Sequence, residues 1–184
     1  MRSCLLLLSL VLACPSLAAA DEALWELLRG GGQVVFMRHA ITTPGVGDPA
    51  GFRLEDCATQ RNLTDAGRED ARRVGATFPS RSIPVGRVLS SPWCRCLETA
   101  RLAFGGTETW TPLSNLFDNR DREAEQLRAL RDIAGRRPSG GNLVLVTHGS
   151  VVFPLTGILP APAELVVLTP DDSGDFRVAG RLTP

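Results

Sequence analysis

The residues of this chain most suited to chemistry are two histidines, each at the end of an apolar run. His39 follows Val-Val-Phe-Met-Arg and His148 follows Leu-Val-Leu-Val-Thr, and the 184 residues contain no other histidine. Short apolar runs rich in valine predict buried strands of a parallel sheet. Such sheets bind ligands beyond the carboxyl ends of their strands. Because Arg38 stands directly before His39, this edge of the sheet is expected to bind an anion.

A second arginine is expected at the same edge. Residues 85–90 read as another strand, and Ser91-Pro92 predicts a helix start because proline is tolerated in a first turn. Arg95 would lie in that turn. If the three strands are neighbours, two guanidiniums and two imidazoles meet near a helix N-terminus, which favours a phosphoryl group. One imidazole can then attack phosphorus while the other donates to a phosphoryl oxygen.

The elements that must position these residues alternate between strand and helix. This alternation predicts an α/β fold, a three-layer α/β/α sandwich with a mostly parallel central sheet. The segment 42–53, rich in glycine and proline, is expected to be a loop. Besides the elements already named, the patterns predict helices over 21–29, 64–78, 121–134 and 150–158, a strand over 109–113, and an edge hairpin over 165–178.

Residues 1–20 have the layout of a secretory signal peptide. A positive start at Met1-Arg2 precedes an apolar stretch and the small residues Ala18 to Ala20. We therefore expect a periplasmic or secreted protein whose mature chain, residues 21–184, forms a single domain without a membrane span. Two alternatives stay open, an uncleaved N-terminal anchor and a lipoprotein anchored at Cys14.

Charge and cysteine content narrow the function further. The chain has 20 basic and 20 acidic residues, so nothing indicates a nucleic-acid partner. Three cysteines remain after the expected cleavage, and export would allow Cys57 to bond with either Cys94 or Cys96. The spacing Cys94-Arg95-Cys96 does not match common zinc sites, so no metal site is expected.

Four segments of the chain resemble the histidine phosphatase superfamily, in its phosphoglycerate-mutase-like branch. They are Arg38-His39-Ala40, Leu63-Thr64-Asp65-Ala66-Gly67, the run from Ser90 to Ala100, and Val146-Thr147-His148-Gly149, in the order of the family. The resemblance implies that His39 is the nucleophile and becomes phosphohistidine. It further implies that the phosphoryl oxygens are held by Arg38, Arg95 and His148, with a hydroxyl from Thr42. It implies a reaction without metal or cofactor on a small phosphorylated substrate.

The chain departs from the family at the acid that protonates the leaving oxygen. Many relatives carry a glutamate where this chain has Asn115. Asp118 is our first candidate for a catalytic acid because it follows the apolar pair Leu116-Phe117 in a loop expected at a strand end. The other candidates are Asp121, Glu123 and Glu164. Without an acid, the enzyme would suit substrates with good leaving groups, such as phosphohistidine, phosphoramidates or acyl phosphates.

The protonation states follow from the expected charges. A nucleophilic His39 must be neutral, and two neighbouring guanidiniums lower its pKa, whereas a bound phosphate dianion favours the charged form of His148. Glu98, near Arg95 on the expected helix, is a candidate to orient that guanidinium. Arg61 and Asn62 are candidates for the pocket mouth. The segment 43–59 offers ordinary loop residues and no evident specificity determinant.

The sequence therefore predicts a metal-independent phosphatase that hydrolyses a phosphomonoester or phosphoramidate through a phosphohistidine on His39. A phosphomutase is one alternative, although the chain has little inserted sequence for a lid that would exclude water. A catalytically weak phosphoryl-binding protein of the cell envelope is the other. A monomer is favoured, and the substrate stays open.

Overall fold

A mixed sheet lies at the centre of the computed structural model, which describes residues 17–118, 120–171 and 173–184. Over these residues the sheet has six strands in the order β3-β2-β4-β1-β5-β6. The strands β3, β2, β4 and β1 are parallel, whereas β5 and β6 form an antiparallel hairpin at one edge. The expected mostly parallel sheet and its edge hairpin are confirmed. The bounds are β1 (Val34–Arg38), β2 (Val85–Ser90), β3 (Glu108–Thr109), β4 (Asn142–Thr147), β5 (Leu165–Pro170) and β6 (Phe176–Leu182).

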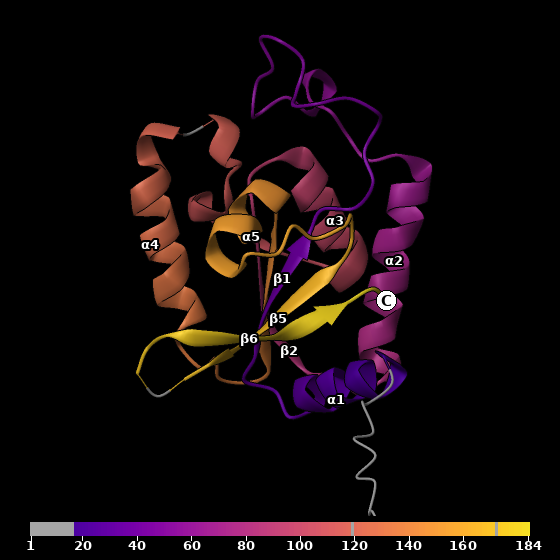
Figure 1. Cartoon of the computed structure of the whole chain (residues 1–184). Helices are drawn as coiled ribbons and strands as arrows, with labels where there is room; N and C mark the ends of the chain where they lie inside the picture. Colours follow the sequence, from indigo (N-terminus) through magenta and orange to yellow (C-terminus); the bar gives the residue numbers. More distant parts are fainter. Residues whose placement is uncertain (1–16, 119, 172) are drawn as a thin grey trace, which may run out of the picture.

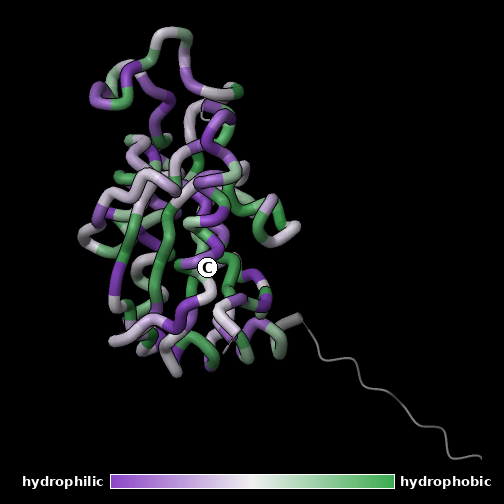
Figure 2. The backbone as a smooth tube through the Cα atoms, turned by 90° about the vertical axis from the view of Figure 1, so that its left-hand side faces the viewer, coloured by the Kyte–Doolittle hydropathy of each residue, from purple (hydrophilic) through white to green (hydrophobic). Residues whose placement is uncertain are grey.

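Helices cover both faces of this sheet, as the three-layer prediction requires (Figure 1). One face carries α1 (Leu17–Arg29), α2 (Asp65–Ser80) and α3 (Cys94–Phe104), and the other carries α4 (Glu123–Ala134) and α5 (Gly149–Thr156). Because both faces are covered, the four residues of β1 from Val34 to Met37 are all apolar and buried. Val35 and Met37 pack toward α1–α3, and Val34 and Phe36 pack toward α4 and α5. Figure 2 shows hydrophobic residues concentrated in these inner strands.

Several element boundaries differ from the sequence prediction, and two of them lie next to β2. The strand predicted over 109–113 was wrong beyond Thr109, because Thr111–Leu113 form a 3₁₀ turn with Pro112 inside it. Proline has no N–H to give to a sheet, and the turn places Leu113 in the core. The helix expected to start at Ser91-Pro92 begins later, at Cys94, with Trp93 as its N-cap.

The expected signal peptide lies mostly outside the described residues. Cys14, the alternative lipid anchor, lies outside them entirely. Helix α1 begins at Leu17, so the expected cleavage after Ala20 would fall within it. Among the residues described, no helix has the length and apolar character needed to cross a membrane.

The sheet register brings three strand ends to one level. Arg38 of β1 pairs with Thr147 of β4, and Val146 of β4 pairs with Ser90 of β2. The pairing continues one residue further, because the amide of His39 donates to the Thr147 carbonyl at 2.9 Å. The residues that follow β1, β2 and β4 therefore meet at one edge of the sheet.

The start of α2 fixes the chain that follows His39. Thr64 caps the helix, and its hydroxyl accepts from the Gly67 amide at 3.0 Å. The Thr64 amide donates to the Ile41 carbonyl at 3.0 Å. Gly67 approaches that carbonyl so closely that a Cβ on residue 67 would overlap its oxygen. A glycine at this position lets α2 pack directly against the segment next to His39.

We predict that Gly67→Ala lowers the free energy of unfolding by about 1–3 kcal/mol, because the added methyl must displace backbone. Urea unfolding measures the change. Gly106→Ala is the matched control, since a Cβ there meets nothing within 4 Å. Equal stability of the Gly67→Ala variant and the wild type would show that the contact is not tight.

Candidate active site

The two histidines lie side by side at the carboxyl ends of β1 and β4. Their ring centroids are 5.4 Å apart with an angle of 68° between the planes. His39 is 5% exposed and His148 is 4% exposed. With hydrogen bonds of ordinary length, this separation suits a single tetrahedral phosphoryl group that contacts both rings.

The hydrogen bond of His39 determines which ring nitrogen is free. Nδ1 lies 2.9 Å from the carbonyl oxygen of Ala40, and a carbonyl can only accept, so Nδ1 carries the proton. The lone pair is then on Nε2. Burial, together with the charges of Arg95, Arg38 and Arg61, lowers the pKa of His39 to about 3. His39 is therefore a neutral imidazole with an available Nε2 lone pair at physiological pH.

Arg38 lies against the start of α5. Its Nη1 donates to the Pro160 carbonyl at 2.8 Å. Its guanidinium carbon is 3.7 Å from the position that a Cβ would occupy on Gly149, the residue after His148. A glycine there leaves room for the guanidinium beside the second histidine.

Arg95 is held by a carboxylate that the sequence analysis did not single out. Its Nη1 lies 2.8 and 3.0 Å from the two oxygens of Asp48, and each side chain of this ion pair is 1% exposed. Asp48 also accepts from the Trp93 indole at 3.0 Å and from the Arg61 amide at 2.9 Å. Burial alone would raise the pKa of Asp48, but these hydrogen bonds outweigh burial and keep it below its ordinary value. Asp48 is therefore ionised and fixes the orientation of Arg95.

Three arginines at this site, Arg38, Arg61 and Arg95, have guanidinium nitrogens without a partner. Among the residues described, the buried side-chain polar atoms without a hydrogen-bond partner are the Nε atoms of Arg38, Arg61 and Arg95. Buried donors without partners are costly, so their gathering at one site indicates a place for acceptor oxygens. With neutral histidines, three guanidiniums and the Asp48 carboxylate leave a surplus of two positive charges, which matches a phosphoryl dianion.

The environment of His148 differs from that of His39. Its Nε2 lies 2.8 Å from the Ser91 hydroxyl, and its Nδ1 lies 3.5 Å from Nη2 of Arg95. The Trp93 ring packs edge-on against it, with centroids 5.5 Å apart. Burial, followed by the charges of His39 and the arginines, lowers the pKa of His148 well below its ordinary value. Without a ligand both imidazoles are thus shifted in the same direction, and only a bound anion would favour the charged form of His148.

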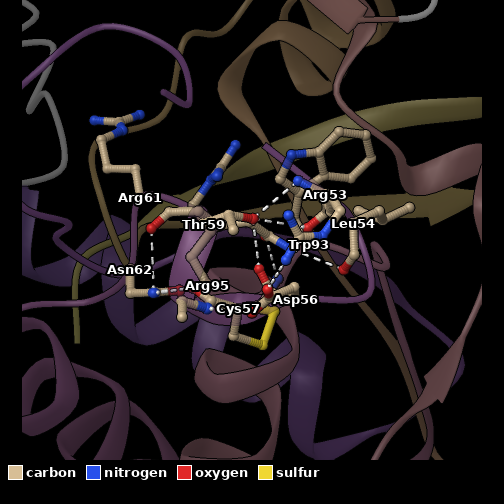
Figure 3. Close-up of a disulfide and its surroundings, with 12 residues drawn as sticks. Arg53, Leu54, Asp56, Cys57, Thr59, Arg61, Asn62, Trp93 and Arg95 are labelled. Atoms are coloured by element: carbon tan, nitrogen blue, oxygen red, sulfur yellow. Dashed lines mark hydrogen bonds and ion pairs between the residues drawn. A yellow bond between two sulfur atoms is a disulfide. The ribbon is translucent and has the colours of Figure 1, made fainter. Parts of the chain in front are cut away.

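A disulfide anchors the segment that carries Asp48. Cys57 bonds to Cys94, the residue before Arg95, which resolves the pairing that the sequence left open. Figure 3 shows this disulfide with Arg95, Trp93 and the surrounding residues of the 53–62 segment. Cys96 is free and buried, and burial raises its pKa to about 12, so it is no thiolate nucleophile.

Two expectations about this region were wrong. Glu98 does not orient Arg95, because its carboxylate pairs with Arg68 at 2.7 Å. The segment 43–59 is more than an ordinary loop, since Asp48 lies in it. Nothing local in the sequence marks Asp48, because its contacts depend on how the loop folds back over α3.

Thr42 lies beside the start of α2, and Asp118 lies beside the start of α5. Thr42 pairs with Leu63 through an isolated backbone bridge, next to the start of α2. Asp118 is exposed and accepts from the Asn115 amide at 2.8 Å, and Asn115 in turn accepts from the Ser150 hydroxyl of α5 at 2.8 Å. These contacts place Asp118 near the start of α5.

The remaining acids are less well placed. Glu164 is 2% exposed, and its oxygens are taken by Arg181 and the Ala161 amide. Asp121 and Glu123 are exposed at the start of α4. In the described part of the chain, no three His, Cys, Asp or Glu side chains gather in a way that could hold a metal ion.

Residues 34–121 match the family model of the histidine phosphatase superfamily, branch 1. Over these residues, the chain belongs to the histidine phosphatase superfamily. The sequence has no match among curated proteins. Membership indicates a phosphatase-type enzyme, because members of the superfamily are phosphatases.

Solved structures of other proteins have a similar fold. The protein histidine phosphatase SixA complexed with tungstate has a TM-score of 0.55 and 20% identity, over 83% of this chain and 97% of that chain. The product of open reading frame Rv3214 from Mycobacterium tuberculosis has a TM-score of 0.54 and 18% identity, over 79% and 94%. A mutant phosphoserine phosphatase from Entamoeba histolytica in complex with phosphoserine has a TM-score of 0.51 and 13% identity, over 81% and 95%. At these identities, the likeness concerns the fold alone.

We predict that Asp48→Asn lowers the free energy of unfolding by about 3–5 kcal/mol, because buried Arg95 loses its counter-charge. Adding Arg95→Met should restore part of the loss, since no unpaired charge then remains. Urea unfolding of the single and double variants tests this. The control is Glu69→Gln, which breaks an exposed pair with Arg72 and should cost less than about 1 kcal/mol. Unchanged stability of Asp48→Asn would contradict the assigned role.

The lowered histidine pKa values predict a pH-dependent stability. An unfolded histidine binds a proton below pH 6.5, whereas His39 stays neutral until about pH 3. The stabilisation is therefore full above pH 6.5 and is lost as the pH falls from 6.5 toward 3. We expect a loss of up to about 1.4 kcal/mol per pH unit for each histidine. Urea unfolding at pH 7, 6 and 5 checks this, with the double variant His39→Gln, His148→Gln as control. A slope that persists in that variant would argue against the two histidines as its source.

Proposed function

We propose that this protein is a phosphatase that transfers a phosphoryl group to His39 and then to water. The observation that carries the proposal is the neutral His39 ring, with its Nε2 lone pair free among guanidiniums that have unpartnered Nε atoms. A neutral imidazole is a nucleophile, and guanidiniums stabilise the charge that develops on phosphoryl oxygens. Because His39 itself supplies the nucleophile, this scheme needs no metal or cofactor.

In the first step, the Nε2 lone pair of His39 forms a bond to phosphorus while the bond from phosphorus to the leaving atom breaks. Arg38 and Arg95 hold the phosphoryl oxygens, His148 donates a hydrogen bond to the oxygen that faces it, and an acid protonates the leaving atom. In the second step, water attacks phosphorus, the P–N bond breaks, and the electron pair returns to Nε2. The proton from water leaves with phosphate or passes to the carboxylate that the acid became in the first step. The substrate is a phosphomonoester or a phosphoramidate.

Asp118 is our proposal for that acid. Asn115 stands at the place where many relatives carry a glutamate, and it donates a hydrogen bond to Asp118. The carboxyl is exposed, so it can exchange protons with solvent. It lies near the first turn of α5, which directly follows His148. Thr42 keeps a proposed role as a hydroxyl donor to the phosphoryl group, supported by its place close after His39.

A phosphoryl-binding protein without turnover is the second candidate. The observation that favours it is Asn115, a buried amide that cannot donate a proton as an acid. Both candidates use the same anion site, so binding of a phosphate analogue does not separate them. Formation of a phosphoenzyme does.

We further propose that the mature protein acts in the periplasm or outside the cell after removal of residues 1–20. The disulfide between Cys57 and Cys94 supports this location, because such bonds persist in oxidising compartments. The Cys14 lipid anchor is the alternative form of the same export. We favour a monomer that meets a small phosphorylated substrate.

The test is hydrolysis of p-nitrophenyl phosphate together with trapping of the phosphoenzyme. We expect His39→Ala to lower kcat/KM by more than about 10³-fold, because the nucleophile is lost. Rapid quenching with labelled substrate should leave alkali-stable, acid-labile phosphate on His39. The control is Arg87→Ala in β2, which removes an exposed pair with Glu108 of β3 and should match the wild type. Full turnover by His39→Ala would contradict the mechanism, and binding without any labelled protein would favour the second candidate.

A further inference from the structure

Three large apolar side chains stand in solvent near the end of β4. Phe117 is 67% exposed, Leu159 is 62% exposed and Phe153 is 55% exposed. Apart from Val46 in the loop after β1, they are the most exposed large hydrophobic residues in the part of the chain that the structure describes. Exposed apolar groups that gather on one surface mark interaction sites. Their positions therefore decide whether they form one surface.

Leu159 and Phe153 lie on the same side of α5 as Arg38. A Cβ built on Gly149 would be 2.8 Å from a methyl of Leu159 and 3.7 Å from the guanidinium carbon of Arg38. Phe153 follows Gly149 by four residues, so it occupies the same helix face one turn later. This face of α5 thus carries apolar groups directly beside a phosphoryl-binding arginine.

Phe117 lies next to the first turn of α5, to which it is linked through Asn115. Its amide donates to the Asn115 side-chain oxygen at 3.4 Å, and the same oxygen accepts from the Ser150 hydroxyl in the first turn of α5. The short turn Leu116–Asp118 packs against α5. We call Phe117, Phe153 and Leu159 the apolar ledge.

We propose that the apolar ledge binds the leaving group of the substrate, and that the preferred substrates are phosphomonoesters of aliphatic or aromatic alcohols. This inference rests on the proposed function. A phosphoryl group held by Arg38 would place its ester oxygen near the start of α5, with the ledge beside it. Asp118, the proposed acid, directly follows Phe117. The acid that protonates the leaving oxygen is therefore next in the chain to a residue that binds the apolar group attached to that oxygen.

The test compares ethyl, butyl and hexyl phosphate, whose leaving groups differ in apolar area and hardly in acidity. A fully buried methylene is worth about fourfold in affinity, and an open ledge gives less per group. We expect kcat/KM of the wild type to rise about tenfold or more from ethyl to hexyl phosphate. The double variant Phe153→Ser, Leu159→Ser should show a rise of less than about threefold. Val178→Ser, which alters an exposed apolar residue of β6, is the control and should keep the wild-type slope.

Binding of the matching alkyl phosphonates, measured by calorimetry, gives the same comparison without turnover. Affinity that rises with chain length in the wild type and not in the double variant supports the ledge even if hydrolysis is absent, in which case the proposed function alone fails. Equal kcat/KM and equal affinity for all chain lengths would overturn the ledge while leaving a phosphatase intact. Sedimentation that shows a wild-type dimer and a monomeric double variant would also overturn it, because the ledge would then be a subunit interface.

Discussion

The site depends on the buried ion pair between Arg95 and Asp48. The guanidinium lies at the second residue of α3, and the carboxylate comes from a loop that follows β1, so the pair joins two parts of the chain that the sheet alone does not connect. The pair neutralises one of the positive charges at the carboxyl ends of the strands and leaves Nε of Arg95 without a partner. A buried pair of this kind contributes little net stability, because desolvation offsets the attraction. Its value here is that it holds an arginine in one orientation.

The protonation states of the two histidines follow from their burial. Both histidines are shut away from water beside guanidiniums, which makes their neutral forms dominant. The Nδ1–H of His39 is held by its neighbour's carbonyl, so the available lone pair is on Nε2. The same burial that keeps His39 neutral, as the proposed nucleophile must be, also costs stability in acid. Chemistry and stability are thus linked through one physical cause, the exclusion of water from the ends of β1 and β4.

The local sequence pattern was sufficient to predict the site residues that lie at strand ends. His39, His148 and Arg38 were identifiable because apolar runs mark buried strands, and parallel strands end at a common edge. The pattern failed where contacts form between distant segments. Asp48 reaches Arg95 across 47 positions, and the choice of Cys94 over Cys96 depends on which sulfur faces the folded loop. The strand predicted over 109–113 was too long, because Pro112 and the burial of Leu113 override the strand tendency of their neighbours.

A crystal structure of the protein with tungstate, an oxyanion of phosphate-like shape, tests the central claim most directly. The account predicts one tungstate at the ends of β1 and β4, with its metal bonded to or facing Nε2 of His39 and its oxygens contacted by Arg38, Arg95 and His148. Asp48 should keep its bond to Arg95 in that complex. An oxyanion bound elsewhere, or one that faces Nδ1 of a rotated His39 ring, would contradict the account.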